Sequence, residues 1–169
     1  ELLYADHLVG KLVNNLRENG TLDDTLLVIT SDHGEFFGED GWLNHGGTIR
    51  EELFRLPCIF HYPKKIKAGT KINQLTSALD IAPTIFDFVG LLKTLEKRTQ
   101  LDGISILDNK NLSNDRVLIV DSPPIVLPER LKHYKKFVAR SRFFYRGSRS
   151  KDYKYVWKSN GIEFLYKVG

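Results

Sequence analysis

The chain has 169 residues, of which 41% are apolar and 27% are charged. This length and composition predict one domain with a hydrophobic core, and no run of 18 apolar residues exists that could span a membrane. The net charge of +4 conceals an asymmetry. Residues 1–62 carry eleven acidic residues and four Lys or Arg, whereas residues 130–158 carry eleven Lys or Arg and Asp152 as the one acid.

The single cysteine and the absence of methionine are also informative. Cys58 cannot form an internal disulfide, which favours a reducing compartment such as the cytoplasm. It lies in an apolar segment, so we expect it to be a packing residue and not a nucleophile. Because the sequence starts with Glu1 and contains no Met, we expect an excised or processed part of a longer protein.

The chain begins with a predicted amphipathic helix over residues 2–19, ending at Gly20. Its apolar residues recur at helical spacing: Leu8, Val9, Leu12, Val13 and Leu16. A short turn then leads into a continuously apolar strand, residues 25–31. A helix followed closely by an apolar strand is typical of α/β proteins.

The strand ends in the motif Thr30-Ser31-Asp32-His33-Gly34-Glu35. Open α/β sheets bind their ligands at the carboxyl ends of strands, and a carboxylate beside an imidazole is half of a metal site. The alternative is that Asp32 caps the turn and His33 is an ordinary turn histidine. A glycine-rich loop follows over residues 32–50 and contains Asn44-His45-Gly46-Gly47.

The rest of the chain alternates short elements with loops. We expect a strand over residues 55–62, a helix from an Asp80 N-cap through Val89, and irregular structure over residues 91–116. Four further strands are predicted in apolar or alternating segments: Val117–Val120, Lys136–Arg146, Asp152–Lys158 and Ile162–Tyr166. The last two are joined by the hairpin signal Ser159-Asn160-Gly161.

The basic segment, residues 130–158, is interleaved with aromatic residues, a pattern that is compatible with nucleic-acid binding. Its alternation in Tyr153–Lys158 favours instead an antiparallel sheet with a solvated basic face or one facing an acidic partner. We therefore do not expect nucleic acid as a partner.

The order of these segments resembles the C-terminal part of sulfatases, in the alkaline-phosphatase-like superfamily. Five segments carry the resemblance: Leu22–Glu35, Gly38–Gly46, Glu51–Ile59, Thr76–Gly90 and Lys154–Tyr166. The resemblance implies an α/β fold with a mainly parallel sheet and flanking helices over residues 1–121, and a small antiparallel subdomain over residues 122–169. Strands 25–31, 56–62 and 117–120 are then expected in the mainly parallel sheet.

The resemblance also implies a chemistry. Asp32 and His33 would be two ligands of a divalent cation, with calcium as the expected metal and manganese or magnesium as alternatives. His45 would bind an anionic ester oxygen or protonate the leaving group, unless it is a solvated loop histidine. Glu35 would orient His33, or be a surface carboxylate.

Two parts of the family's pattern are missing from this sequence. No Cys/Ser-x-Pro-x-Arg motif, the source of the family's formylglycine nucleophile, is present, and neither is the Asp pair of the first strand. We therefore expect the C-terminal portion of a sulfuric ester hydrolase, inactive alone, with a sulfate ester and the missing N-terminal part as partners. The alternatives are a phosphoester hydrolase or phosphotransferase of the same superfamily, or a non-catalytic anion-binding domain.

Overall fold

The computed structural model describes residues 1–107, 112–125 and 142–168. The chain divides into two compact units: residues 1–31 with 56–71, and residues 32–55 with 72–169. None of the helices in the described ranges combines the length and apolar character that a membrane crossing requires.

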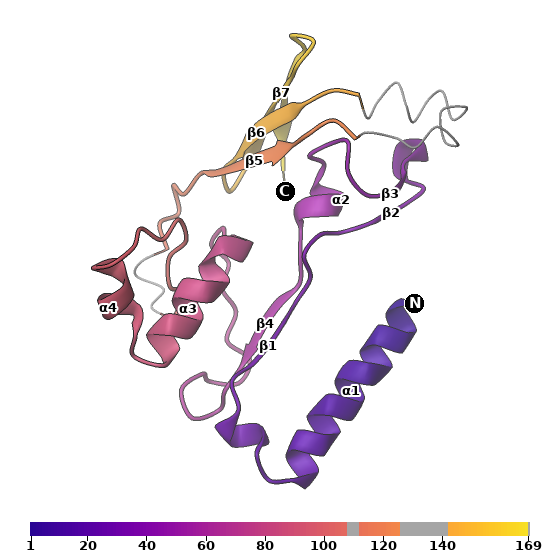
Figure 1. Cartoon of the computed structure of the whole chain (residues 1–169). Coiled ribbons are helices and arrows are strands. Elements are labelled where there is room, and N and C mark those ends of the chain that lie inside the picture. Colours follow the sequence, from indigo (N-terminus) through magenta and orange to yellow (C-terminus); the bar gives the residue numbers. More distant parts are fainter. Residues whose placement is uncertain (108–111, 126–141, 169) are drawn as a thin grey trace. The chain divides into compact units, whose positions relative to one another are not determined.

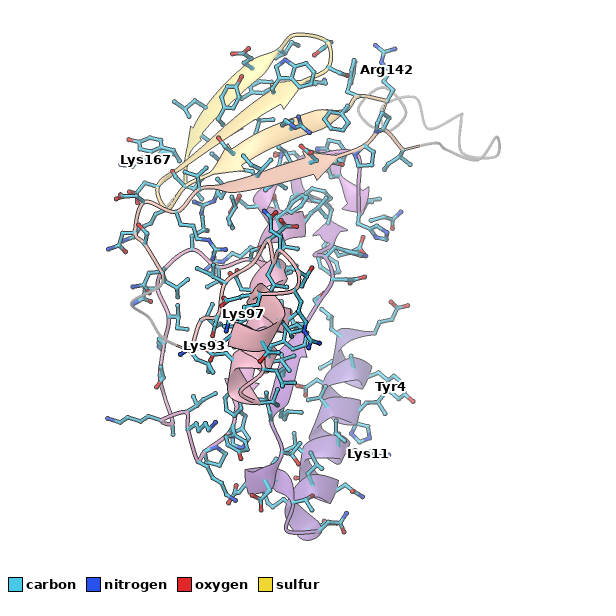
Figure 2. The ribbon with its side chains drawn as sticks, turned by 60° about the vertical axis from the view of Figure 1, so that its left-hand side comes forward. Tyr4, Lys11, Lys93, Lys97, Arg142 and Lys167 are labelled. Atoms are coloured by element: carbon cyan, nitrogen blue, oxygen red, sulfur yellow. The ribbon has the colours of Figure 1, made fainter. Side chains whose placement is uncertain are left out.

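The first unit holds helix α1 (Leu2–Glu18), the short helix η1 (Leu22–Asp24) and strands β1 (Leu27–Thr30) and β4 (Cys58–His61). The predicted helix and both predicted strands are therefore present (Figure 1). No residue of α1 is buried, and side chains such as Tyr4 and Lys11 extend from it (Figure 2).

Strands β1 and β4 pair antiparallel, and Thr30 lies opposite Cys58. The end of β1 therefore lies beside the start of β4. A parallel pair would need a connection that crosses back to the other end of the sheet, and residues 31–57 do not make one. Cys58, which was expected to be a packing residue, is exposed. No residue of this unit, all of which is described, is fully buried, so the unit has no core that could enclose the thiol.

The second unit begins with the loop after β1. This loop contains strands β2 (Phe36–Phe37) and β3 (Leu43–Asn44), joined through the short helix η2 (Glu39–Gly41), and ends in helix α2 (Glu51–Phe54). Phe36, Trp42 and Leu53 form a buried cluster beneath the loop, and the Phe36 and Trp42 rings stack with centroids 5.5 Å apart. This cluster gives a glycine-rich segment a fixed structure.

The helical part of this unit contains η3 (Ala78–Asp80), α3 (Ile81–Phe88) and α4 (Leu92–Glu96). Helix α4, which carries Lys93 (Figure 2), lies in the segment that the sequence predicted to be irregular. The predicted N-cap, Asp80, does not cap α3 with its side chain. The carboxylate instead accepts hydrogen bonds from Ser77 N and Ile104 N and pairs with Arg116.

The C-terminal sheet has the order β5-β6-β7-β8, and all its pairs are antiparallel. Its strands are β5 (Leu118–Ser122), β6 (Tyr145–Arg149), β7 (Tyr153–Lys158) and β8 (Glu163–Lys167) (Figure 1). Part of the predicted strand Lys136–Arg146 lies outside the described residues. The predicted hairpin between β7 and β8 is present, with Gly161 at a positive φ of 83°.

The prediction that residues 117–120 lie in the same sheet as residues 25–31 and 56–62 is wrong. Strand β5 pairs with β6, and Ser122 lies opposite Tyr145. Its burial alternates along Leu118–Ser122, as expected of a strand in a sheet with one covered face. The predicted boundary between two subdomains, after residue 121, falls inside β5. The division into these subdomains remains a prediction.

The loop that contains β2 and β3 is fastened to this sheet. Ile49 packs in a buried cluster with Tyr145 and Val156. At the start of α2, Glu51 Oε1 accepts a hydrogen bond of 2.7 Å from the buried Lys154, and Glu51 Oε2 lies 3.3 Å from Arg149 Nε. Burial would raise the pKa of Glu51, but the hydrogen bond and charge of Lys154, with Arg149, lower it on balance.

Candidate metal and ester site

The candidate site begins two residues after β1, at Asp32 and His33. Asp32 Oδ1 accepts a hydrogen bond of 2.9 Å from the His33 backbone N–H. The other oxygen, Oδ2, lies 3.7 Å from His33 Nε2. Asp32 is almost fully exposed, and His33 is partly exposed.

The His33 ring is oriented by the backbone. Its Nδ1 lies 2.9 Å from the carbonyl oxygen of Gly34, and because a carbonyl only accepts, Nδ1 carries the hydrogen. In a neutral ring the lone pair is then on Nε2, which lies 3.7 Å from Asp32 Oδ2. Metal–ligand bonds of about 2.0–2.6 Å put neighbouring ligands about 3–4 Å apart, so these two atoms fit one divalent cation.

Gly34 is required at this turn by a close backbone approach. Its N–H donates a hydrogen bond of 2.8 Å to Leu53 O, and a Cβ at this position would lie 1.9 Å from Glu52 O. Any side chain would therefore push the Asp32–His33 turn away from α2. The glycine fixes the position of the turn relative to the loop that carries His45.

His45 lies beside His33, with ring centroids 4.1 Å apart and planes inclined by 33°. Its Nδ1 lies 3.1 Å from Glu35 Oε2. Glu35 therefore contacts His45 directly, and its predicted role in orienting His33 remains a prediction. No direct signal for this pairing is present in the sequence, although two short apolar pairs on either side of a glycine-rich turn could have indicated a hairpin.

A second set of possible metal ligands overlaps the first. Ligand atoms of His33, Glu35 and His45 all lie within 4.8 Å of one another. Glu35 Oε1 is buried and has no hydrogen-bond partner in the described part of the chain. Imidazole nitrogens and a carboxylate suit manganese or zinc better than calcium. The chain thus offers donors for a divalent cation in two sets that share His33.

Arg50 connects the loop to its surroundings. Its guanidinium pairs with Asp40 Oδ2 at 2.6 Å and Glu52 Oε1 at 2.7 Å, and it lies over the Phe36 ring. The hydrogen bond to Glu52 raises the pKa of Arg50, and the one from Arg50 lowers the pKa of Glu52. Because both carboxylates already occupy this guanidinium, we assign Arg50 a structural role.

Comparison with known proteins identifies the family to which this chain belongs. The model of the sulfatase family matches residues 1–91. The chain is also 33% identical over 166 residues to an N-acetylglucosamine-6-O-sulfatase from Bacteroides thetaiotaomicron, a match that covers 96% of this chain. The chain belongs to the sulfatase family, whose members generally use a divalent metal. It spans 27% of the length of that relative.

Solved structures confirm the alkaline-phosphatase-like fold class. One, determined in complex with its substrate D-glucosamine-2-N,6-O-disulfate, matches with a TM-score of 0.74 and 29% identity over 98% of this chain and 32% of that chain. Another, the phosphonate monoester hydrolase of Agrobacterium radiobacter, matches with a TM-score of 0.70 and 26% identity over 96% of this chain and 32% of that chain.

Proposed function

We propose that this chain is part of an enzyme that hydrolyses sulfate monoesters with the help of a divalent metal. The observation that carries the proposal is the group Asp32, His33 and His45, brought together on one loop in a member of the sulfatase family. The sulfatase name of the relative that matches 96% of the chain supports the same reaction.

Asp32 Oδ2 and His33 Nε2 would hold the cation, which we propose to be calcium, with manganese or magnesium as alternatives. The bound metal would act as a Lewis acid on the ester oxygens. The chain's own contribution is to fix both ligands. Asp32 is held by the His33 N–H, and the His33 ring is held by the Gly34 carbonyl.

His45 would contact the ester itself. It is partly exposed and lies next to the proposed ligand His33, so an ester oxygen near the metal would lie within its reach. An imidazole can bind an anionic oxygen when protonated or donate a proton to the leaving group. We propose one of these roles for His45.

The nucleophile would come from a preceding part of the same protein. Cys58 is followed by Ile59-Phe60-His61, so it does not have the family's modified motif. With two proposed ligands and no nucleophile, we expect the isolated chain to bind metal weakly and to be inactive.

Reconstitution tests this proposal. The chain is mixed with the N-terminal portion of its own protein and calcium or manganese, and sulfate release from 4-nitrophenyl sulfate and N-acetylglucosamine 6-sulfate is measured. We expect activity only after mixing, and its loss in Asp32→Ala or His33→Ala. Activity of the isolated chain that survives Asp32→Ala would show that the site is wrong.

A phosphonate or phosphate ester is the second candidate substrate, favoured by the similarity to the phosphonate monoester hydrolase. The same reconstituted protein is assayed with 4-nitrophenyl phosphate and a phenylphosphonate monoester. Faster turnover of either of these than of the sulfate esters would replace the proposed reaction and leave the proposed site intact.

A further inference from the structure

The pairing of β2 with β3 brings a carboxylate opposite the proposed ester-binding histidine. In this antiparallel pair Phe36 lies opposite Asn44 and Phe37 lies opposite Leu43. Continuing the register by one position places Glu35 opposite His45. Directly opposed residues of an antiparallel pair carry neighbouring side chains on one face, which is why the two side chains meet although ten positions separate them.

The contact between these side chains fixes which nitrogen of His45 carries hydrogen. Glu35 Oε2 lies 3.1 Å from Nδ1 of His45. Because an ionised carboxylate can only accept hydrogen bonds, Nδ1 must be the donor. Nε2 is then the nitrogen left for other contacts, since the hydrogen bond at one ring nitrogen determines the role of the other.

The position of the Glu35 carboxylate is restricted by its surroundings. Phe36, the next residue, is buried with Trp42 and Leu53, so the backbone that carries Glu35 is anchored in the core of the loop. Glu35 Oε1 is shielded from solvent, whereas the carboxylate as a whole is only partly covered. The His33 ring packs against the His45 ring, with centroids 4.1 Å apart, and limits rotation of the His45 ring.

We propose that Glu35 is a positioning residue for His45. It holds Nδ1 by a hydrogen bond and thereby presents Nε2 to the anionic group of the ester. That His45 contacts the ester rests on the proposed function. The hydrogen bond between Glu35 and His45, and the tautomer that follows from it, are independent of that function. A carboxylate that orients an imidazole by its Nδ1–H is a recurrent arrangement in hydrolases.

The tautomer is measured without any turnover. In the 15N-labelled chain, long-range 1H–15N spectra distinguish Nδ1–H from Nε2–H in neutral histidine rings, and His45→Gln assigns the His45 signals. We expect the Nδ1–H form for His45 in the unsubstituted chain and its loss in Glu35→Ala. Glu39→Gln is the matched control, because Glu39 lies in the same loop and its carboxylate contacts the Phe37 N–H instead.

Two results would overturn the inference: an Nε2–H tautomer of His45 in the unsubstituted chain, or an Nδ1–H tautomer that persists in Glu35→Ala. If Glu35→Ala does not fold, the first measurement still decides. Glu35→Gln, which keeps the size of the side chain, then replaces the alanine variant and is expected to weaken the preference for Nδ1–H.

A kinetic measurement separates positioning from folding. In the reconstituted protein we expect Glu35→Ala to lower kcat by about 10–100-fold, as is typical for residues that orient metal-ligating histidines, with KM nearly unchanged. Glu35→Asp should restore part of the rate. An unchanged kcat would reject the positioning role. Absence of all activity on mixing would contradict the proposed function. The 1H–15N spectrum would still show whether Glu35 holds Nδ1 of His45.

Discussion

Asp80 shows how a single buried residue organises the helical part of the chain. Its carboxylate is 1% exposed and pairs with Arg116 through two hydrogen bonds, of 2.6 and 2.7 Å. Burial alone would raise the pKa of Asp80. The hydrogen bonds from Arg116, Ile104 N and Ser77 N outweigh that effect and lower the pKa.

The first prediction concerns the stability of this pair. Asp80→Asn leaves Arg116 without its counter-charge in a buried place, and breaking such a pair costs about 3–5 kcal/mol of unfolding free energy. Urea unfolding followed by circular dichroism measures this loss. The control is Asp121→Asn, which removes the partner of the largely exposed Arg146 and should cost far less. Equal losses would contradict the assignment.

The same pair gives a second prediction, for pH. Because the folded-state pKa of Asp80 is lowered, the stability it contributes is complete above the ordinary aspartate pKa of about 3.9. It is lost as the pH falls from there through the lowered value. The stability difference between the unsubstituted chain and Asp80→Asn should therefore shrink on acidification below about pH 4. A difference that stays constant from pH 7 to pH 3 would reject this linkage.

At the scale of elements, the Asp32–His33 turn depends on its close contact with α2. The third prediction is that Gly34→Ala destabilises the chain by about 1–3 kcal/mol, because the new Cβ would overlap Glu52 O and force a backbone shift. It should also weaken metal binding by the reconstituted protein. Thermal unfolding measures the first effect.

Gly10→Ala is the matched control for this substitution. Gly10 lies inside α1, where a Cβ would meet nothing within 4 Å, so alanine should stabilise the helix by about 0.5–1 kcal/mol. The two glycines should thus respond with opposite signs. A tolerated Gly34→Ala would mean that the turn does not need its approach to α2.

For the whole molecule, the exposed apolar side chains of α1 lead to the fourth prediction. Leu8 and Leu12 lie one turn apart, and both are exposed although the helix is amphipathic. An uncovered apolar face of this kind favours association. We expect the isolated chain to self-associate, and Leu8→Glu with Leu12→Glu to shift it toward the monomer in sedimentation velocity.

The control for α1 reverses a charge and keeps both leucines. Lys11→Glu changes a charge on the same helix (Figure 2) without altering the leucine pair. It should leave self-association largely unchanged. A chain that is monomeric without substitution, or a dimer that survives both glutamates, would contradict the expectation.

Several features follow from the sequence alone because they are local. Helical periodicity predicted α1, and continuous apolar runs predicted β1 and β4. Asp32 and His33 are covalent neighbours after an apolar strand, so their proximity requires no tertiary information. Five matching segments in order also indicated the sulfatase family, to which the chain belongs.

Tertiary structure decided which distant groups meet. Strand β5 pairs with a strand more than twenty residues away. The sequence of a short apolar strand does not indicate which other strand it will pair with. Likewise, the contact of Glu35 with His45 requires the β2–β3 register, and the pairing of Asp80 with Arg116 closes a loop of 36 positions. The physical reason is that local propensity acts over a few residues, whereas register and burial are set by packing across the whole fold.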